Sequence, residues 1–358
     1  IIVIMSGNFV QRGEPALFDK WVRTRMALHG GADMVLELPV HSALSSSQDF
    51  ARGAIAVLEG LRCVDTLSFG AETADLTLLN EIASVLETQP ADYRQFLTGY
   101  LQSGYSYPKA QHSAITHIMG PLYGDILAQP NNILAIEYLR ALHFWNSHIH
   151  PCAIPRYSDY RATELQPQFA SAMAIRADMI RGSNQWQQYI DPKILSLYQH
   201  PIREDALFQA LLYCLRSLSS HALSQIRDVR EGFENRLSRA AYQASSYTEL
   251  LQLCKSKRFT MARIKRILLN ALLGITCSLS NEIQQAPFYA RVLGIRKESL
   301  SLLSLCAKHS QIPVYTQLPR QTTHPSILLD IRASDLYALA SQPVTPGGQD
   351  YTQPLIVL

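Results

Sequence analysis

The sequence contains no apolar run long enough to cross a membrane. The longest candidate, residues 267–277, is interrupted by Asn270 and Gly274, whereas a membrane-spanning helix needs about 18–20 apolar residues. The opening residues IIVIMSGNF lack the basic flank and the small-residue cleavage site of a secretory signal. These absences argue against a membrane partner, and the opening residues are typical of a buried strand.

Paired cysteines and metal-ligand patterns are also missing. The six cysteines are scattered without a C-x-x-C pair, which favours a reducing, cytoplasmic environment over a disulfide framework or a cysteine-based zinc site. Among the histidines the close pair is His148 and His150, and no third ligand has suitable spacing beside it. No P-loop, G-x-S-x-G or G-x-G-x-x-G motif occurs. The sequence therefore predicts no metal site.

The chain does have abundant apolar residues and an uneven distribution of charge. Of its 358 residues, 47% are hydrophobic and 17% are charged, which is typical of a globular protein of about two domains. Residues 1–190 carry a net charge of −4 and residues 191–358 a net charge of +7. The basic half suits a polyanionic partner, although a solvated basic surface explains the charge equally well.

Strands and helices alternate in the first half. Apolar runs rich in β-branched residues predict strands over 1–5, 34–38, 63–69 and 149–155. Helical spacing predicts helices over 19–28, 49–61, 75–88, 91–102, 131–146 and 170–181. This alternation predicts an α/β fold with a parallel sheet covered on both faces.

The second half is expected to be all-α. From about Pro192 onward the apolar pattern is helical, for example over 203–218, 232–243 and 259–274. We place the boundary between Gly182 and Pro192. The expected domains are therefore a ligand-binding α/β domain over 1–185 and a helical domain over 192–358.

Parallel sheets bind ligands at the carboxyl ends of their strands, and polar residues follow the predicted strands. Gly70 would let a ligand approach closely, although a helix-entry turn also explains it. Asn131 or Asn132 opens a helix, where capping explains either residue and reading a nucleotide is the alternative. Arg156 follows a strand and Arg176 lies near a helix start. Both suit phosphate binding, with a surface salt bridge as the alternative.

The segment SGNFVQRGEP at 6–15 follows the first strand. Gly7 and Gly13 allow close backbone approach and unusual φ angles, and Arg12 could face an anion. A simple connection between two elements remains the more economical interpretation.

The densest charge cluster is KSKRFTMARIKR at 255–266, where six of twelve residues are basic. Thr260 predicts the start of a helix that packs its apolar face inward and presents its cations outward. A row of cations attracts phosphates. With the net charge of this half, it favours RNA or DNA over a merely solvated face. The basic residues are Lys255, Lys257, Arg258, Arg263, Lys265 and Arg266.

Several motifs together resemble the bacterial tRNA(Met) cytidine acetate ligase family. The resemblance runs in order over nearly the whole chain, and its two longest blocks are specific. The motifs are MSGNFVQRGEPALFDKWVRTRMAL (5–28), GADMVLELP (31–39), FGAE (69–72), PNNILAIEYLRAL (130–142), SAMAIR (171–176), EGFENRL (231–237), KSKRFTMARIKRILLNALLGI (255–275) and RVLGI (291–295).

The resemblance implies a Rossmann-like nucleotidyltransferase domain followed by a helical tRNA-binding domain. It implies that ATP, with magnesium, and acetate give acetyl-adenylate and pyrophosphate. The acetyl group then passes to the wobble cytidine of elongator tRNA(Met), giving N(4)-acetylcytidine. ATP contacts would fall on Gly70, Asn131 and Arg156, a further phosphate contact on Arg176, and tRNA contacts on the six cations of 255–266. No catalytic residue is assigned.

Two departures from the family pattern matter. The family's His-x-Gly-His signature lies on a first strand and helix N-terminal to MSGNF, and this chain does not contain it. Because Ile1 begins inside a strand, we expect the first strand to be missing and the 358-residue chain alone to be inactive. In SAMAIR, Met173 and Ala174 replace small hydroxylated residues that could donate to a phosphate.

Two other functions stay open at this point. One is a nucleotidyltransferase that acts on a small molecule, which would have little use for a basic helix. The other is a non-catalytic RNA-binding protein whose nucleotide site has decayed.

Overall fold

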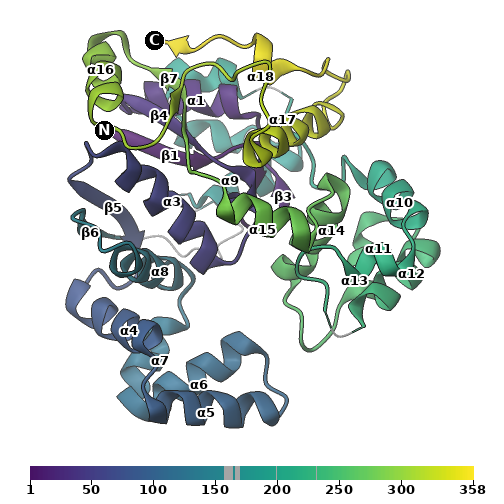
Figure 1. Ribbon diagram of the computed structural model, residues 1–358. Coiled ribbons are helices and arrows are strands. Elements are labelled where there is room, and N and C mark those ends of the chain that lie inside the picture. The colour runs from purple at the N-terminus through teal and green to yellow at the C-terminus, as the bar shows by residue number, and fades with distance from the viewer. Residues whose placement is uncertain (157–163, 166–169, 199, 231) are drawn as a thin grey trace. The chain divides into compact units, whose positions relative to one another are not determined.

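A computed structural model of the chain describes residues 1–156, 164–165, 170–198, 200–230 and 232–358. Its contacts group the chain into two compact units (Figure 1). Unit 1 comprises Ile1–Ser46, Asp191–Ser256 and Thr260–Leu358, and unit 2 comprises Ser47–Ile190 and Lys257–Phe259. Within the described part of the chain, every helix is too short or too polar to cross a membrane.

Unit 1 is built on a five-stranded sheet in the order β1-β4-β7-β8, with β9 also paired to β7. Strands β1 and β4 are parallel, as expected, and the helix α1 connects them, whereas β4 and β7 are antiparallel. Figure 1 shows these three strands side by side. The bounds are β1 Ile2–Ser6, α1 Lys20–His29, β4 Met34–Leu38, β7 Ala290–Ile295, β8 Val314–Tyr315 and β9 Ile356–Val357.

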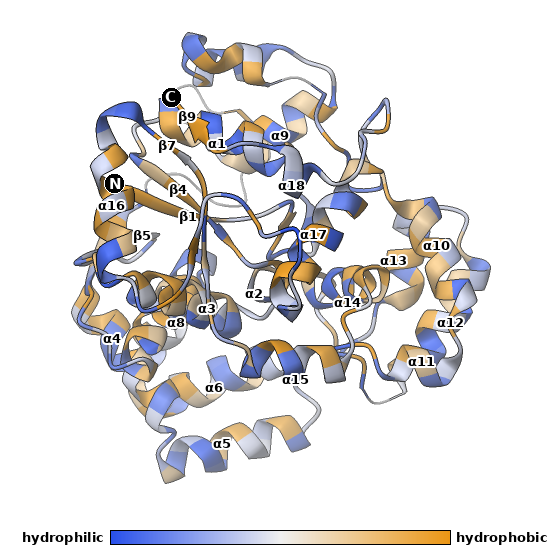
Figure 2. Cartoon of the chain, turned by 45° about the horizontal axis from the view of Figure 1, so that its top comes forward, coloured by the Kyte–Doolittle hydropathy of each residue, from blue (hydrophilic) through white to orange (hydrophobic). Residues whose placement is uncertain are grey.

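Strand β4 is buried at all five positions, as expected for a strand with both faces covered. Figure 2 shows β1 and β4 largely in the orange of hydrophobic residues. Helix α1 begins where the Asp19 side chain accepts a hydrogen bond from the Val22 N–H at 2.7 Å, which satisfies one of the free donors of the first turn. The helix ends at Gly30.

The C-terminal strands were not expected, and they change the division of the chain. Strand β7 lies against β4, with Met34 opposite Ile295 and Glu37 opposite Arg291. The first 46 residues therefore group with the C-terminal part, rather than with the rest of 1–185 as the sequence suggested. A short apolar run such as RVLGI cannot be distinguished by periodicity from a buried helical segment, and its strand partner is remote in sequence.

The α/β class and the helical region are confirmed. Among the described residues from 208 to 285, the regular elements are helices, with bounds α10 Phe208–Ser217, α11 Ser220–Ser224, α12 Phe233–Gln243, α13 Tyr247–Cys254, α14 Met261–Leu273 and α15 Cys277–Gln285. The remaining strands and α-helices of unit 1 are β2 Phe9–Val10, β3 Glu14–Pro15, α2 Val40–Ala43, α16 Leu300–His309, α17 Pro325–Ala338 and α18 Gln349–Thr352. Short 3-10 helices span Pro192–Leu197 and Lys297–Ser299.

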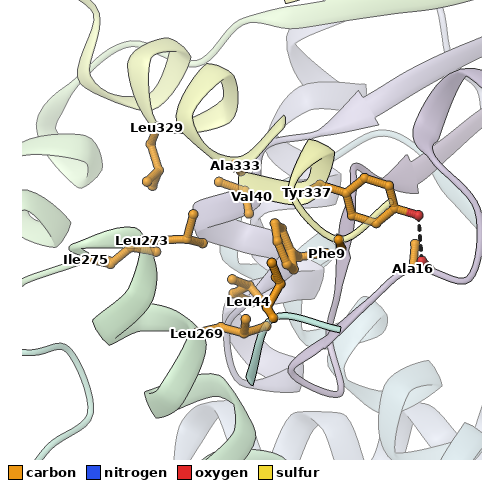
Figure 3. Packing of buried hydrophobic residues seen from close by; sticks show 12 residues of the cluster. Phe9, Ala16, Val40, Leu44, Leu269, Leu273, Ile275, Leu329, Ala333 and Tyr337 are labelled. Atoms are coloured by element: carbon orange, nitrogen blue, oxygen red, sulfur yellow. Dashed lines mark hydrogen bonds between the residues drawn. The ribbon is translucent and has the colours of Figure 1, made fainter. Parts of the chain in front are cut away.

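One hydrophobic core of unit 1 fixes the segment after β1 against α14 and α17 (Figure 3). Phe9 is fully buried and meets the ring of Tyr337 edge-on, with 6.0 Å between the centroids. The Tyr337 hydroxyl donates to the Ala16 carbonyl at 2.7 Å. The other core residues are Val40, Leu44, Leu207, Leu269, Leu273, Ile275, Leu329, Ala333 and Ala340.

Unit 2 contains the parallel strand pair β5 and β6 with helices packed around it. Helix α8 contacts α3, α4 and β5 and so forms the centre of this unit. The bounds are α3 Ser47–Leu61, β5 Thr66–Ala71, α4 Leu76–Thr88, α5 Ala91–Gln102, α6 Tyr107–Met119, α7 Pro121–Leu127, α8 Pro130–Phe144, β6 His150–Pro155 and α9 Ala172–Ile180.

A cluster of buried charges lies inside unit 1. The Lys20 ammonium bonds to both carboxylate oxygens of Glu37, at 2.8 and 2.9 Å, and to Asp350 at 2.7 Å. Arg291 pairs with the same two carboxylates. Burial raises the pKa of Asp350, but Lys20 and Arg291 outweigh it and leave that pKa below its ordinary value. All four side chains are nearly inaccessible to solvent, so each charge depends on its partners.

Asp330 is a third buried carboxyl group close to this cluster. It accepts hydrogen bonds from the Val40 N–H at 2.8 Å and from the Tyr289 hydroxyl. Complete burial, followed by the negative charge of Glu37, raises the pKa of Asp330 from 3.8 to about 7.

We expect Lys20→Met to lower the free energy of unfolding by about 3–5 kcal/mol, because two buried carboxylates then share a single cation. Urea unfolding followed by circular dichroism measures the change. The matched control is Lys193→Met, at an exposed lysine, which should change stability by less than about 0.5 kcal/mol. Equal effects of the two substitutions would show that the buried cluster contributes nothing.

Asp330→Asn should change how stability depends on pH. The pKa of Asp330 is higher in the folded protein, so this carboxyl group favours folding at low pH. That contribution is lost as the pH rises from about 4 through 7. The neutral amide removes this dependence while its oxygen still accepts from Val40. Relative to wild type, the variant should therefore gain on the order of 1–3 kcal/mol between pH 4 and pH 8. A pH-independent difference would contradict this assignment.

Candidate functional site

The parallel strands β5 and β6 end together at one edge of unit 2. Gly70 lies opposite Ile154 and Ala71 opposite Pro155, and the Arg156 N–H donates to the Ala71 carbonyl at 2.9 Å. The polar residues that follow the two strands therefore meet at one place, as parallel strands require. Of the segment PRYSDYR (155–161), residues 157–161 lie outside the described residues.

Gly70 and Arg156 are packed against each other at this edge. A Cβ atom on Gly70 would lie 3.1 Å from Cγ and from Cδ of Arg156, so a side chain at position 70 would displace the arginine. Both residues are exposed to solvent. The absence of a side chain at Gly70 thus allows the Arg156 side chain to lie along the strand end with its guanidinium accessible to a ligand.

Glu72 joins this edge to the N-terminus of α8. One of its carboxylate oxygens accepts from the backbone N–H and from Nδ2 of Asn131, at 3.2 and 2.7 Å. The other accepts from the Asn132 N–H at 2.9 Å. A carboxylate suits the positive end of a helix dipole. Because Nδ2 of Asn131 donates one N–H to Glu72, the amide oxygen Oδ1 and the second N–H of Nδ2 are left for a ligand.

The neighbouring Asn132 has a structural role. Its side chain is fully buried. Its Oδ1 accepts from the Thr73 N–H at 2.9 Å, and its Nδ2 donates to the Ile126 carbonyl at 3.1 Å and to Gln129 at 2.8 Å. These bonds leave it no free group for a ligand. Of the two asparagines, Asn131 is therefore the one available at the surface.

The capping interpretation of these asparagines was wrong. Helix α8 begins at Pro130, its N-cap is Gln129, and no side chain of that residue caps it. Both asparagines lie inside the first turn, and the Glu72 carboxylate from a different element satisfies their N–H groups. The sequence contains GAE directly after the third strand, but nothing in it indicates that Glu72 reaches a helix 59 residues further along the chain.

Arg176 lies in the second turn of α9, which begins where the Ser171 hydroxyl accepts from the Ala174 N–H at 3.0 Å. The side chain of Arg176 is half-buried, and no ion pair or hydrogen bond joins it to another described residue. The structure records no contact between Arg176 and the Gly70–Arg156 edge, so its predicted phosphate role remains a prediction.

The six cations of 255–266 are not equivalent. Lys255, Lys257 and Arg258 are exposed. Arg263 is partly exposed and lies 3.6 Å from an Asp228 carboxylate oxygen. These four cations are placed where a phosphate could reach them.

Contrary to the prediction from the sequence, Lys265 and Arg266 do not face solvent. The Lys265 ammonium binds Glu14 at 2.7 Å and Glu204 at 2.6 Å. Burial lowers the pKa of Lys265, but the two carboxylates raise it more, so the net shift is upward. Arg266 is buried, and its Nη1 donates to the Gln11 carbonyl at 3.1 Å. Helical spacing alone places these cations on a polar face, but it does not show that another element covers that face.

The loop around Gly13 explains this covering. Gly13 has a φ of +79°, and a Cβ atom there would lie 2.5 Å from the Arg266 backbone nitrogen. Glycine is therefore required both for the backbone conformation and for the close contact with α14. The unusual φ was predicted at this position, but the partner is a helix of the same unit rather than an anion.

Gly70, Asn131 and Arg156 lie where β5 and β6 end, and we call this place the strand-end edge. Its glycine, oriented amide and arginine define a candidate nucleotide-binding α/β protein. A family model described as HIGH Nucleotidyl Transferase matches residues 1–351. The chain belongs to this family, which confirms the predicted resemblance.

Individual relatives are similar over the whole chain. A tRNA(Met) cytidine acetate ligase of Thermoanaerobacter sp. (strain X514) is 39% identical over 100% of this chain and 92% of its own length. The tRNA(Met) cytidine acetate ligase of Acetivibrio thermocellus is 33% identical, again over 100% of this chain and 92% of its own length. The apo crystal structure of Thermotoga maritima TmcAL superposes with a TM-score of 0.92 at 31% identity. It too covers 100% of this chain and 92% of that one. A second structure of that protein, bound with alpha-thio ATP, gives a TM-score of 0.89 at 30% identity.

The contrast between the two asparagines gives a prediction for stability. Asn132→Ala should lower the free energy of unfolding by about 1–3 kcal/mol, because buried partners lose their hydrogen bonds. Asn131→Ala should cost less than about 1 kcal/mol, since the helix N–H groups keep their bonds to Glu72. Thermal unfolding of the two variants side by side measures the difference, and a larger loss for Asn131→Ala would contradict it.

Proposed function

We propose that this protein is an ATP-dependent acetate ligase that forms N(4)-acetylcytidine at the wobble position of elongator tRNA(Met). The full-length similarity to proteins named tRNA(Met) cytidine acetate ligase carries this proposal. The strand-end edge of unit 2 supports it, because it exposes the same three residues that the resemblance assigned to ATP: Gly70, Asn131 and Arg156.

The first step activates acetate. A carboxylate oxygen of acetate attacks the α-phosphorus of ATP, the bond to the β-phosphate oxygen breaks, and pyrophosphate leaves. The product, acetyl-adenylate, carries a good leaving group that acetate itself lacks. Phosphoryl chemistry of this kind needs positioning and charge neutralisation more than covalent help.

The second step transfers the acetyl group. The exocyclic nitrogen of cytidine attacks the acyl carbon, the bond to the phosphate oxygen breaks, AMP leaves, and the nitrogen loses a proton. An unpaired base of an anticodon loop can be splayed into a pocket, which a base inside a helix cannot do without unstacking.

The residues at the strand-end edge have separate roles in this scheme. The exposed Arg156 guanidinium neutralises phosphate charge, with Arg176 as a second cation. Gly70 leaves room for the Arg156 side chain and places its own backbone beside the nucleotide. Asn131, held by Glu72, offers its Oδ1 as an acceptor to an N–H or O–H of the nucleotide.

Magnesium is expected to arrive with the triphosphate. Both Glu72 oxygens are engaged by α8, and no group of three or more His, Cys, Asp or Glu in the described ranges could hold a metal ion. The ion would then be bound through phosphate oxygens and water.

For tRNA, the exposed cations Lys255, Lys257 and Arg258 and the partly exposed Arg263 bind phosphates. Lys265 and Arg266 instead fix α14 against the loop around Gly13. The free cysteines and a tRNA substrate both fit a cytoplasmic protein.

The decisive test measures pyrophosphate release and base acetylation with ATP and acetate, with and without tRNA(Met). It should use the full-length protein. Acetate-dependent acetylation of the tRNA supports the proposal. Turnover that is independent of tRNA favours a small-molecule nucleotidyltransferase, and tRNA binding without any turnover favours a non-catalytic RNA-binding protein.

Arg156→Ala should raise the KM for ATP about 10- to 100-fold, because a charge-assisted contact to phosphate is lost. The KM for tRNA should not change. The matched control is Arg94→Ala, at an exposed arginine on α5 of the same unit, which should leave both constants unchanged. An unaltered KM for ATP in the Arg156 variant would remove this residue from the nucleotide site.

A further inference from the structure

Two tyrosines on the helical part of unit 1 are unusually exposed. Tyr213 on α10 is 77% exposed and Tyr242 on α12 is 67% exposed. Tyrosine normally buries most of its ring. Rings left in water on a folded surface are available to stack on a partner.

The two tyrosines lie on neighbouring helices joined through Arg216. Helices α10 and α12 contact each other. Arg216 Nε donates to the Ala241 carbonyl at 2.8 Å, and the Tyr242 hydroxyl lies 3.5 Å from the Arg216 carbonyl. Tyr213 precedes Arg216 by three residues, which places both on the same side of α10.

Every fully exposed charged residue of α10 and α12 is basic, and the one acidic residue of these helices, Glu234, is half-buried. The exposed charged residues are the three arginines Arg216, Arg236 and Arg239. Residues 206–264, which leave out the internally bound Lys265 and Arg266, carry nine Lys and Arg against four Asp and Glu, a net charge of +5.

This surface continues to the basic segment. Arg236 Nη1 donates to the Leu253 carbonyl at 3.4 Å and to the Lys255 carbonyl at 2.8 Å. Arg239, one turn further along α12, is exposed and has no ion pair or hydrogen bond with another described residue. The path from Tyr213 therefore ends at Lys255, the first cation of the 255–266 cluster.

We propose that Tyr213, Arg216, Arg236, Arg239 and Tyr242 form a binding face for unpaired nucleotides of RNA. Each tyrosine ring stacks on a base, and the guanidinium groups bind the phosphates between them. The two rings are separated by cations, and the combination of stacking rings with cations between them is the arrangement that binds single-stranded nucleic acid. The inference rests on the proposed function, since the RNA that the face would receive is the substrate tRNA.

The experiment measures binding of fluorescently labelled tRNA(Met) to the 358-residue chain by anisotropy at several salt concentrations. Tyr213→Ala and Tyr242→Ala should each weaken binding about tenfold, because each loses a stacked base. Tyr213→Phe and Tyr242→Phe should retain wild-type affinity, since the ring remains. Arg239→Ala should lower the slope of log affinity against log salt concentration by about one. The control is Arg320→Ala, at an exposed arginine in a loop of the same unit, and it should leave this slope unchanged.

Three outcomes would contradict the proposed RNA-binding face. One is an unchanged affinity of both alanine variants. Another is an equal loss for alanine and phenylalanine, which would show that the hydroxyl groups and not the rings matter. The third is an equal effect on a fully paired RNA duplex, which offers no base for stacking. Failure of the proposed function would be different: wild-type protein would give no acetate-dependent acetylation, whatever the affinity of the variants for tRNA.

Discussion

The arrangement of unit 1 depends on four buried charges that must contact one another. The cations are Lys20 and Arg291, and the carboxylates are Glu37 and Asp350. They come from α1 and β4 near the start of the chain and from β7 and α18 near its end, so one cluster holds the two ends of the sequence together. Glu37 and Arg291 are also direct neighbours across the β4–β7 pair. A one-residue slip of that pair would turn one charge away from the other and leave it buried alone, at a cost of several kcal/mol.

The strands of the first half were predictable because each is a local run of apolar, β-branched residues. The structure places β1, β4, β5 and β6 within a few residues of the expected runs. Strand β7 was not predictable, because its pairing with β4 depends on a partner more than 250 residues away. One signal was available: Glu37 and Arg291 are charged residues inside apolar runs, MVLEL and ARVLGI. Such residues are rarely buried unless paired, so each indicates an opposite charge elsewhere in the fold.

The basic helix shows the corresponding limit for surfaces. Spacing correctly places the apolar side of α14 inward and Thr260 as its N-cap. Spacing does not reveal that the segment 10–15 lies over part of the polar side, where Gly13 allows contact at backbone distance. Lys265 and Arg266 consequently bond to other residues of the same unit. A count of cations therefore overestimates the charge that a helix offers to a nucleic acid, and burial and ion pairing must be subtracted first.

The same limit applies to the strand-end edge, where Glu72 fixes the orientation of the Asn131 amide. The sequence identifies Gly70, the asparagine pair and Arg156 as polar or flexible positions after strands, but not which atom of which asparagine is presented. Glu72 settles this, because a carboxylate accepts only hydrogen-bond donors and so takes Nδ2 of Asn131. Under the proposed function, Oδ1 then accepts from a donor of the nucleotide. An aspartate at position 131 would place a second negative charge beside Glu72, and the amide orientation that Glu72 fixes would be lost.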